Sequence, residues 1–170
     1  MNSFEQIKNM NFDALVLEGG SLKCAFTAGI LDVLMDSDFP EFKYYYGVSS
    51  GSMAMSYLLS KQRSNFIKVT RALVEDPNFI SYRNTFSQQG LMNLDFLQGY
   101  VHESYPFDEE AADRNSEGKT VCIVATDHGT GKPHYLTPSK GKWLNYMMAS
   151  ATLPFITKGR TKVDGKWMFD

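Results

Sequence analysis

The sequence predicts an α/β fold in which strands alternate with helices. Two observations lead to this prediction. Twice, a short apolar run ends in a glycine- or serine-rich turn and is followed by apolar residues at helical spacing. Such strand–turn–helix units are typical of sheets with crossover helices. The 170 residues match the length of one domain and no repeat or linker interrupts them, so we expect a single domain over residues 1–170.

The first strand–turn–helix unit lies near the N-terminus. Residues 13–18 (DALVLE) form an apolar run that ends at Gly19 and Gly20, which predicts a buried strand closed by a turn. Residues 24–35 predict the helix, because four apolar residues fall on one of its faces: Phe26, Ile30, Val33 and Leu34.

The second unit begins with residues 42–48 (FKYYYGV). They are aromatic and β-prone, and they predict a strand that ends in a glycine- and serine-rich turn. An apolar helix through Met53, Tyr57 and Leu58 is expected after this turn. Residues 64–75 predict a further helix, because Phe66, Val69 and Leu73 recur at helical spacing before Pro77 stops the pattern.

The remaining elements are less regular and then β-rich. Residues 78–105 predict short helical turns and loop, and residues 107–115 predict an acidic helix that faces solvent. Residues 119–126 predict a strand paired through a glycine turn with residues 133–136. A helix is expected over residues 142–150. The last expected element is a hairpin of residues 161–163 and 166–169 around the Asp164-Gly165 turn.

Charge and cysteine content exclude several classes of function. The 17 basic and 19 acidic residues give a net charge of -2, so no basic excess is available for a nucleic-acid partner. Cys24 and Cys122 are far apart and form no Cys/His cluster, which argues against a disulfide framework and a zinc site. The start of the sequence lacks the pattern of a signal peptide, and we expect a reducing, cytoplasmic location.

The segment Gly47-Val48-Ser49-Ser50-Gly51 matches the G-x-S-x-G pattern between an expected strand and an expected helix. This is the context of a nucleophile elbow, where a sharp, strained turn exposes the serine hydroxyl and close neighbouring backbone requires glycine on either side. The start of the next helix adds N–H groups and a positive dipole end. The alternative is a glycine- and serine-rich helix cap without chemistry.

A second candidate loop contains Gly19, Gly20, Ser21 and Lys23 at the first strand-to-helix turn. Small residues there expose successive N–H groups as an anion cradle, which suits a phosphate or the oxyanion of acyl transfer. The spacing matches neither G-x-G-x-x-G nor GxxxxGK[ST], so a nucleotide site is not expected. Lys23 either adds positive potential or is an ordinary surface residue.

Five ordered blocks resemble the patatin-like phospholipases, most closely their bacterial stand-alone type: LVLEGGSLKCAFTAGILDVL, YYGVSSGSMAMSYLL, ATDHGTGKPHYLT, MMASATLPF and VDGKWMFD. The resemblance runs from about Leu15 to the last residue. It implies a three-layer α/β/α sandwich with a mostly parallel central sheet. In that family an oxyanion loop G-G-G-x-[KR]-G, a G-x-S-x-G serine and the Asp of a D-G-[GA] motif act without a histidine.

Carried over residue by residue, the resemblance implies Ser49 as nucleophile and Asp170 as its base. It implies Gly19, Gly20 and Ser21, with Lys23, as the oxyanion loop. No cofactor and no metal are expected. An unperturbed Asp has a pKa of about 3.9 and is a weak base for a serine hydroxyl, so the oxyanion donors must assist.

The sequence departs from the family pattern at three places. Ser21 replaces the third glycine of the oxyanion loop, which a serine tolerates if its φ angle is negative. Cys24 replaces the glycine after the basic residue; it is either packed and inert or partly exposed and reactive. Asp170 is the last residue, so the rest of D-G-[GA] is absent. We therefore expect a fragment of a longer chain, with a sheet that is incomplete at its C-terminal end.

Other polar residues offer weaker alternatives. None of His102, His128 and His134 fits the Ser, Asp, His order of a triad with enough chain after it. Asp164 precedes Gly165 and is expected in a hairpin turn rather than in the dyad. Four acidic residues crowd one short helix without a histidine, and a solvated face is expected rather than a metal site: Asp108, Glu109, Glu110 and Asp113.

The sequence therefore predicts a serine lipid acyl hydrolase acting on phospholipid or another acyl-ester lipid, with peripheral membrane contact. The nine Met residues and the 14% aromatic content fit either a deep apolar pocket or a methionine-patched core. Met53, Met55 and Met92 are candidates for an acyl pocket. The alternative function is a non-catalytic module that binds anions or lipids through the same two N–H-rich loops. The oligomeric state is left open.

Overall fold

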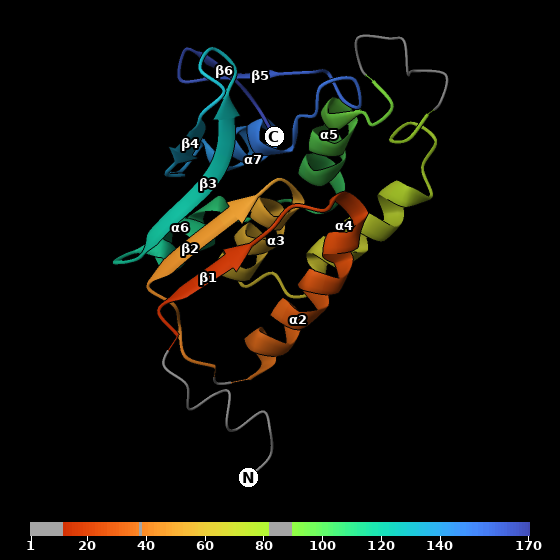
Figure 1. The fold of residues 1–170 in the computed structure, drawn as a ribbon. Coiled ribbons are helices and arrows are strands. Elements are labelled where there is room, and N and C mark those ends of the chain that lie inside the picture. Colours follow the sequence, from red (N-terminus) through yellow and green to blue (C-terminus); the bar gives the residue numbers. More distant parts are fainter. Residues whose placement is uncertain (1–11, 38, 82–89) are drawn as a thin grey trace.

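The computed structural model describes residues 12–37, 39–81 and 90–170. Strands and helices alternate through the first half and a strand-rich segment closes the chain (Figure 1). In chain order the elements are β1 (Ala14–Leu17), the 3₁₀ turn η1 (Ser21–Lys23), α2 (Cys24–Asp36), β2 (Tyr44–Val48), α3 (Ser50–Leu59), α4 (Asn65–Val74), α5 (Leu94–Ser104), α6 (Glu109–Ser116), β3 (Thr120–Asp127), β4 (Pro133–Leu136), α7 (Trp143–Ala151), β5 (Thr161–Val163) and β6 (Lys166–Phe169).

The six strands form one open sheet in the order β1-β2-β3-β6-β5, with β4 paired beside β3. β1, β2 and β3 run parallel, in a register that places Gly47 of β2 between Leu17 and Ile123. β4 and β6 both pair antiparallel with β3, and β5 pairs antiparallel with β6. Because the carboxyl ends of parallel strands meet at one edge, the turns after β1 and β2 lie next to each other.

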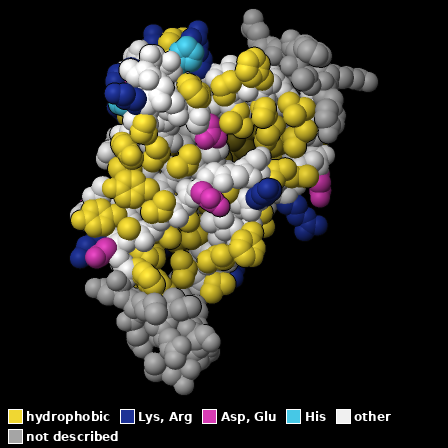
Figure 2. Space-filling view, in the orientation of Figure 1, with side chains coloured by type: hydrophobic (Ala, Val, Ile, Leu, Met, Phe, Trp, Pro, Cys, Tyr) yellow, Lys and Arg dark blue, Asp and Glu magenta, His cyan; other side chains and the backbone are white. Residues whose placement is uncertain are grey.

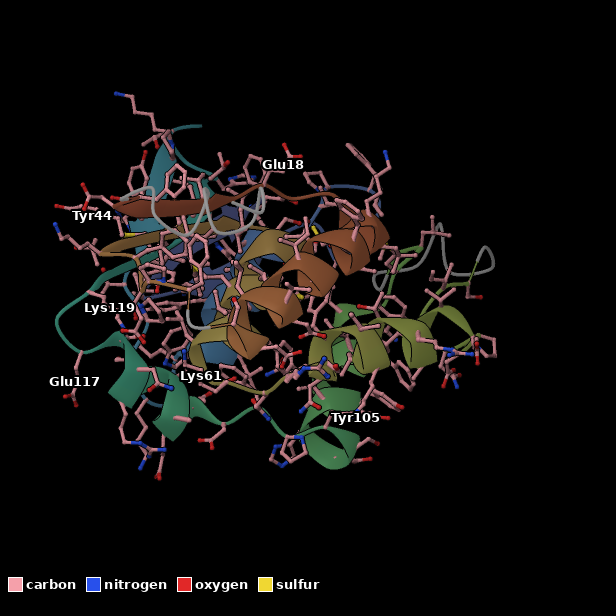
Figure 3. The ribbon with its side chains drawn as sticks, turned by 90° about the horizontal axis from the view of Figure 1, so that it is seen from below. Glu18, Tyr44, Lys61, Tyr105, Glu117 and Lys119 are labelled. Atoms are coloured by element: carbon pink, nitrogen blue, oxygen red, sulfur yellow. The ribbon has the colours of Figure 1, made fainter. Side chains whose placement is uncertain are left out.

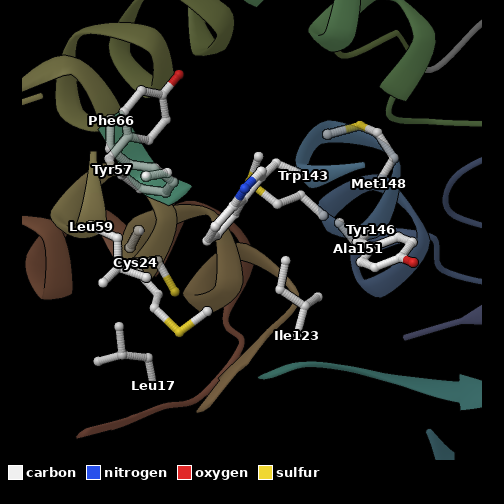
Figure 4. Close-up of a cluster of buried hydrophobic side chains, with 14 of the residues drawn as sticks. Leu17, Cys24, Tyr57, Leu59, Phe66, Ile123, Trp143, Tyr146, Met148 and Ala151 are labelled. Atoms are coloured by element: carbon white, nitrogen blue, oxygen red, sulfur yellow. The ribbon is translucent and has the colours of Figure 1, made fainter. Parts of the chain in front are cut away.

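The described helices lie on one side of the sheet, as the view from below shows (Figure 3). α3 packs against β1 and β2, and α7 packs against β3. Their interface is the core, where Met55, Ile123, Trp143 and Met168 are fully buried. Figure 4 shows Ile123 and Trp143 within this cluster. Burying an apolar side chain of this size contributes about 1.5–3 kcal/mol each. The predicted α/β class is confirmed, with helices packed against an open sheet.

The other side of the sheet carries exposed apolar side chains, among them Val16, Tyr44 and Tyr135. Figure 2 shows hydrophobic side chains spread over this face. The described residues place no helix there, so the second helical layer of the expected sandwich is not formed by the part of the chain that the structure describes.

The apolar face predicted for α2 from the spacing of its residues is largely exposed. Phe26 is 78% exposed, Ile30 49% and Val33 53%, whereas Ala28 and Leu31 are buried. The helix is therefore predicted correctly, but its apolar stripe does not pack against the sheet. The periodicity of apolar residues identifies a face and cannot tell what covers it.

The segment at residues 78–105 differs from its prediction. An eleven-residue helix, α5, covers its second half, where only short turns and loop were expected. The Asn93 side chain caps it by accepting a hydrogen bond from Phe96 N–H over 3.0 Å, and Leu94, Leu97 and Val101 are buried. The prediction for residues 82–89 lies outside the described residues. No helix in the described ranges is long and apolar enough to cross a bilayer.

Candidate active site

Ser49 lies on the turn between β2 and α3 and has an unusual backbone conformation. Its φ is 52° and its ψ is -132°, a region that costs a non-glycine residue about 1–3 kcal/mol. Ser52 holds the turn, because both its N–H and its hydroxyl donate to the carbonyl oxygen of Ser49, over 2.9 and 2.6 Å. This is the strained strand-to-helix geometry that the G-x-S-x-G pattern predicts.

Ser150 of α7 supports the same turn from the opposite side. Its hydroxyl accepts a hydrogen bond from Ser49 N–H over 2.7 Å and donates to the carbonyl oxygen of Val124 over 2.5 Å. Ser150 is fully buried. The strained Ser49 backbone is thereby tied to β3 and α7 at once.

The two glycines of the turn are required by close approach of other backbone atoms. A Cβ on Gly47 would lie 2.6 Å from Ser52 Cα. A Cβ on Gly51 would overlap the carbonyl oxygen of Glu18, which precedes the glycine-rich loop. Val48 ends β2, and Ser50 begins α3. The turn after β2 and the loop after β1 therefore touch backbone to backbone.

The loop after β1 lies directly against the serine. A Cβ on Gly19 would come within 2.8 Å of Ser49 Cβ and 3.5 Å of its Oγ. Lys23 N–H donates to the carbonyl oxygen of Gly20 over 3.1 Å and turns the loop into η1. The Lys23 side chain is exposed. The structure thus brings the predicted oxyanion loop and the predicted nucleophile together.

The two departures within this loop are accommodated differently. Ser21 has a φ of 52°, so the condition under which serine fits this position without strain, a negative φ, is not met: serine here takes a left-handed conformation that suits glycine better. Cys24 is 3% exposed and its Sγ accepts a hydrogen bond from the Ser50 hydroxyl over 3.0 Å. Of the two alternatives for Cys24, the packed side chain is the one observed.

Asp170 meets Ser49 at the end of β6. Its carboxyl lies close enough to the Ser49 side chain for that side chain to lower the pKa of Asp170. Pairing of Phe169 with Thr126 in β3 fixes the end of β6, and Asp170 N–H donates to the carbonyl oxygen of Thr152 over 2.8 Å. The fold therefore juxtaposes two polar side chains that are 121 positions apart in the sequence.

The surroundings of Asp170 change its acidity. Burial raises the pKa of this carboxyl above its ordinary value of 3.8, and the Ser49 side chain lowers it again in part. A higher pKa makes the carboxylate a stronger base than an exposed Asp. The raised pKa of Asp170 therefore increases its basicity above that of an unperturbed Asp, which is a weak base for a serine hydroxyl.

An apolar cavity of about 90 Å³ borders Ser49. A single water molecule needs about 10–15 Å³ of such space, so the cavity is several times larger. Aliphatic, aromatic and methionine side chains from α3, α4, α5 and α7 make up most of its wall. Met53 and Met92 line it, whereas Met55 is fully buried in the core.

The histidines lie apart from this arrangement. His128 follows β3 and packs its ring edge-to-face on Phe169, with centroids 6.0 Å apart. His134 belongs to β4 and His102 to α5. Among the described residues none of the three makes a hydrogen bond to Ser49.

The remaining acidic candidates are held by other contacts. Asp164 occupies the β5–β6 turn, and hydrogen bonds from Tyr146 and Lys142 lower its pKa. Asp108 caps α6 by accepting from Ala111 N–H over 2.8 Å. Asp113 accepts from the indole N–H of Trp143 over 2.7 Å. Within the described ranges no three His, Cys, Asp or Glu side chains gather as a metal site would require.

Sequence reasoning missed the role of Ser150 in the turn and the place of Tyr57 in the cavity wall. Ser150 occurs in the quoted block MMASATLPF, but no local pattern marks which of its residues reaches Ser49. Tyr57 follows Met53 by four residues on the same face of α3, and that spacing is a signal that could have placed it beside the cavity.

Comparisons with known proteins show the family of this chain. The model of the family described as patatin-like phospholipase matches residues 15–170. The chain is also similar to the uncharacterized protein YjjU of Escherichia coli (strain K12), with 29% identity over 153 residues. That alignment covers 89% of this chain and 43% of YjjU, so the chain spans less than half the length of this relative. The chain belongs to the patatin-like phospholipase family, a family of lipid acyl hydrolases.

Proposed function

We propose that the protein is a serine acyl hydrolase that cleaves carboxylic esters of lipids through a dyad of Ser49 and Asp170. One observation supports this most directly: the Ser49 side chain lies against the half-buried carboxyl of Asp170, whose pKa is raised, beside an apolar cavity. A nucleophile paired with a base is the arrangement that covalent acyl transfer requires.

In the acylation step Ser49 Oγ attacks the ester carbonyl and Asp170 takes its proton. The carbonyl oxygen becomes an oxyanion, and the tetrahedral intermediate collapses as the C–O bond to the alcohol breaks. The departing alkoxide receives the proton from Asp170. The products of this step are the free alcohol and an acyl ester on Ser49, with Asp170 again ionised.

Deacylation repeats the sequence with water as the nucleophile. Asp170 accepts one proton of the water as its oxygen attacks the acyl ester, and returns that proton to Ser49 Oγ as the ester bond breaks. The fatty acid leaves and the free hydroxyl is regenerated. No cofactor or metal takes part in either step of this proposal.

Two groups of backbone N–H donors are available for the oxyanion. The loop of Gly19, Gly20 and Ser21 lies against Ser49, and the N–H groups of Ser50 and Gly51 precede the first hydrogen bond of α3, which Ser52 N–H makes to Ser49 O. Removing one such donor in other serine hydrolases costs on the order of 3 kcal/mol in the barrier. Lys23, on the first turn beyond the loop, adds positive potential.

The cavity supports a lipid as substrate, because its wall matches an acyl chain better than a polar group. Phospholipids and other acyl-ester lipids present such chains at a membrane surface. The proposal therefore includes peripheral contact with a membrane from a reducing, cytoplasmic compartment.

Ester hydrolysis tests the proposal. We expect turnover of p-nitrophenyl esters by the wild type, and a fall in kcat/KM of about 10⁴-fold in Ser49→Ala and in Asp170→Asn. Asp164→Asn is the matched control, since Asp164 is a second carboxylate of the same hairpin region held by Tyr146 and Lys142. It should retain activity.

The alternative outcome is a binding protein without catalysis. Ser21 in its left-handed conformation is the feature that favours this alternative, because it strains the loop that should hold the oxyanion. Absence of turnover in the wild type, together with saturable binding of anionic lipid by Ser49→Ala, would replace the hydrolase proposal with this one.

A further inference from the structure

The loop between α7 and β5 presents an aromatic side chain to solvent. Phe155 is 91% exposed and its φ is 67°, a left-handed conformation that is rare for a bulky residue. Leu153 N–H donates to the Thr157 hydroxyl over 2.8 Å and closes the loop around Phe155. Met92 N–H donates to the Ile156 carbonyl oxygen over 2.9 Å and fixes its far side. The fold thus holds a strained backbone and an exposed ring that its own core does not use.

The hairpin that follows this loop is basic. Residues 152–169 carry a net charge of +3, whereas the whole chain carries -2. Figure 2 shows Lys and Arg side chains together with hydrophobic ones at the end of the molecule where Figure 1 draws β5 and β6. The charged residues of this stretch are four bases and one acid: Lys158, Arg160, Lys162, Lys166 and Asp164.

Two of these bases are paired and two are not. Lys158 and Lys166 form ion pairs with carboxylates of α5 and β3, over 2.5 and 3.7 Å. Arg160 and Lys162 are exposed, and neither forms an ion pair within the part of the chain that the structure describes. Both lie over the ring of Trp167 instead, at 4.6 and 5.9 Å from its centroid. Two cations and a 43% exposed Trp therefore share the outer face of the hairpin.

We propose that Phe155 and the outer face of the β5–β6 hairpin form a docking surface for an anionic lipid bilayer. The inference rests on the proposed function, because a hydrolase of membrane lipids meets its substrate at a bilayer. Phe155 inserts among the acyl chains, and Trp167 lies at the level of the headgroups, where an aromatic ring with a polar N–H is favoured. Arg160 and Lys162 are attracted to the anionic headgroups.

The docking surface adjoins the candidate active site. An open hollow of about 590 Å³ lies beside Phe155. Thr157 lines both this hollow and the cavity that borders Ser49. Phe169 lines the hollow as well, and the next residue is Asp170. A bilayer docked on Phe155 is therefore separated from the cavity beside Ser49 by the residues of this one loop.

Binding to vesicles tests the surface without turnover. The probes are vesicles of the dialkyl ether analogue of phosphatidylcholine, alone and mixed in equal parts with that of phosphatidylserine, so that no carboxylic ester is present. We expect the wild type to sediment more strongly with the anionic vesicles than with the neutral ones. Phe155→Ala should weaken binding to the anionic vesicles about tenfold, because the inserted ring is lost. Phe26→Ala is the matched control, since Phe26 is 78% exposed on α2. It should bind like the wild type.

A charge variant tests the cations separately. Arg160→Gln combined with Lys162→Gln should weaken binding to the anionic vesicles about 30-fold and change binding to the neutral vesicles little, because each basic residue contributes at an anionic surface only. The matched control combines Lys68→Gln with Arg71→Gln. These two exposed residues of α4 carry the same charge on another surface, and binding should stay as in the wild type.

Equal binding to the two kinds of vesicle, or equal losses in a variant and its matched control, would overturn the inference. Ser49-dependent turnover of p-nitrophenyl esters in solution judges the hydrolase proposal separately, because that assay contains no vesicle. Absence of vesicle binding beside such turnover would overturn the docking surface alone. Binding that depends on Phe155 without any turnover would support the docking surface and overturn the hydrolase proposal.

Discussion

The Ser49 backbone is strained, and side chains remote in sequence hold it. Ser150 matters most, because its hydroxyl bridges Ser49 N–H and the carbonyl oxygen of Val124. Both of these backbone groups lie in the interior, where an unmade hydrogen bond is expensive. The backbone geometry of the proposed nucleophile therefore depends on Ser150, a serine to which the proposed mechanism gives no chemical step.

Ser150→Ala should show this dependence. The change leaves a buried N–H without its acceptor, and we expect unfolding free energy to fall by about 1–3 kcal/mol and kcat by about tenfold. Ser56→Ala is the matched control, since Ser56 is equally buried but its hydroxyl donates only to Ser52 O within α3. Chemical denaturation and ester hydrolysis measure the two effects; equal losses in both variants would contradict the account.

The sequence predicted the geometry of some single residues and not that of others. Ser49 and its glycines form a contiguous pattern, and their geometry followed from it. The partnership of Ser49 with Ser150 depends on how α7 packs on β3, which no neighbouring residue encodes. The sign of the Ser21 φ could not be predicted from the sequence, because the conformation of a loop residue is set by the elements that the loop joins.

At the scale of elements, the site depends on the contact between the loop after β1 and the start of α3. Parallel pairing of β1 with β2 brings the two segments to one edge of the sheet. Gly51 then lies so close to Glu18 that any side chain would push the loop away. The position of the loop after β1 is therefore coupled to the position of the start of α3.

Gly51→Ala should break this contact. Its new methyl group would overlap the Glu18 carbonyl, and we expect a loss of about 1–3 kcal/mol in unfolding free energy together with loss of activity. Gly29→Ala in α2 is the control, because its Cβ would meet no atom within 4 Å. It should stabilise the protein by about 0.5–1 kcal/mol, as alanine favours a helix over glycine. A stable, active Gly51→Ala protein would refute the proposed contact.

Elements with local signals were predicted well and those with mixed composition were not. The β5–β6 hairpin has its bounds as predicted, because the Asp164-Gly165 turn fixes the register of its strands. α5 was missed although Asn93 caps it and buried residues recur in it, since the surrounding aromatic and polar residues obscured that pattern. The cavity wall joins four helices and has no signature in any one of them.

For the molecule as a whole, the ionisation of Asp170 links activity to stability. Its pKa is raised by burial, so the carboxyl favours the folded state most below the unfolded value of about 3.9. This contribution is lost as the pH rises through the higher folded value. The charged form, which the proposed mechanism uses as base at neutral pH, therefore destabilises the fold.

Asp170→Asn should accordingly raise Tm at pH 7 while it removes hydrolysis, and the gain should vanish below about pH 4. Asp164→Asn should have the opposite sign, because hydrogen bonds from Tyr146 and Lys142 lower the pKa of Asp164. Thermal unfolding followed by circular dichroism at both pH values checks this pair. A lower Tm for Asp170→Asn at pH 7 would contradict this prediction, because it would mean that the ionised carboxylate stabilises the folded state.

Covalent labelling of Ser49 tests the central claim most directly. A fluorophosphonate probe should add to Ser49 of the wild type, as located by mass spectrometry of its peptides. The labelling rate should rise tenfold per pH unit up to a midpoint above 3.8, and should fall sharply in Asp170→Asn. A labelling rate that depends neither on pH nor on Asp170, or the absence of label on Ser49, would contradict a dyad of these two residues.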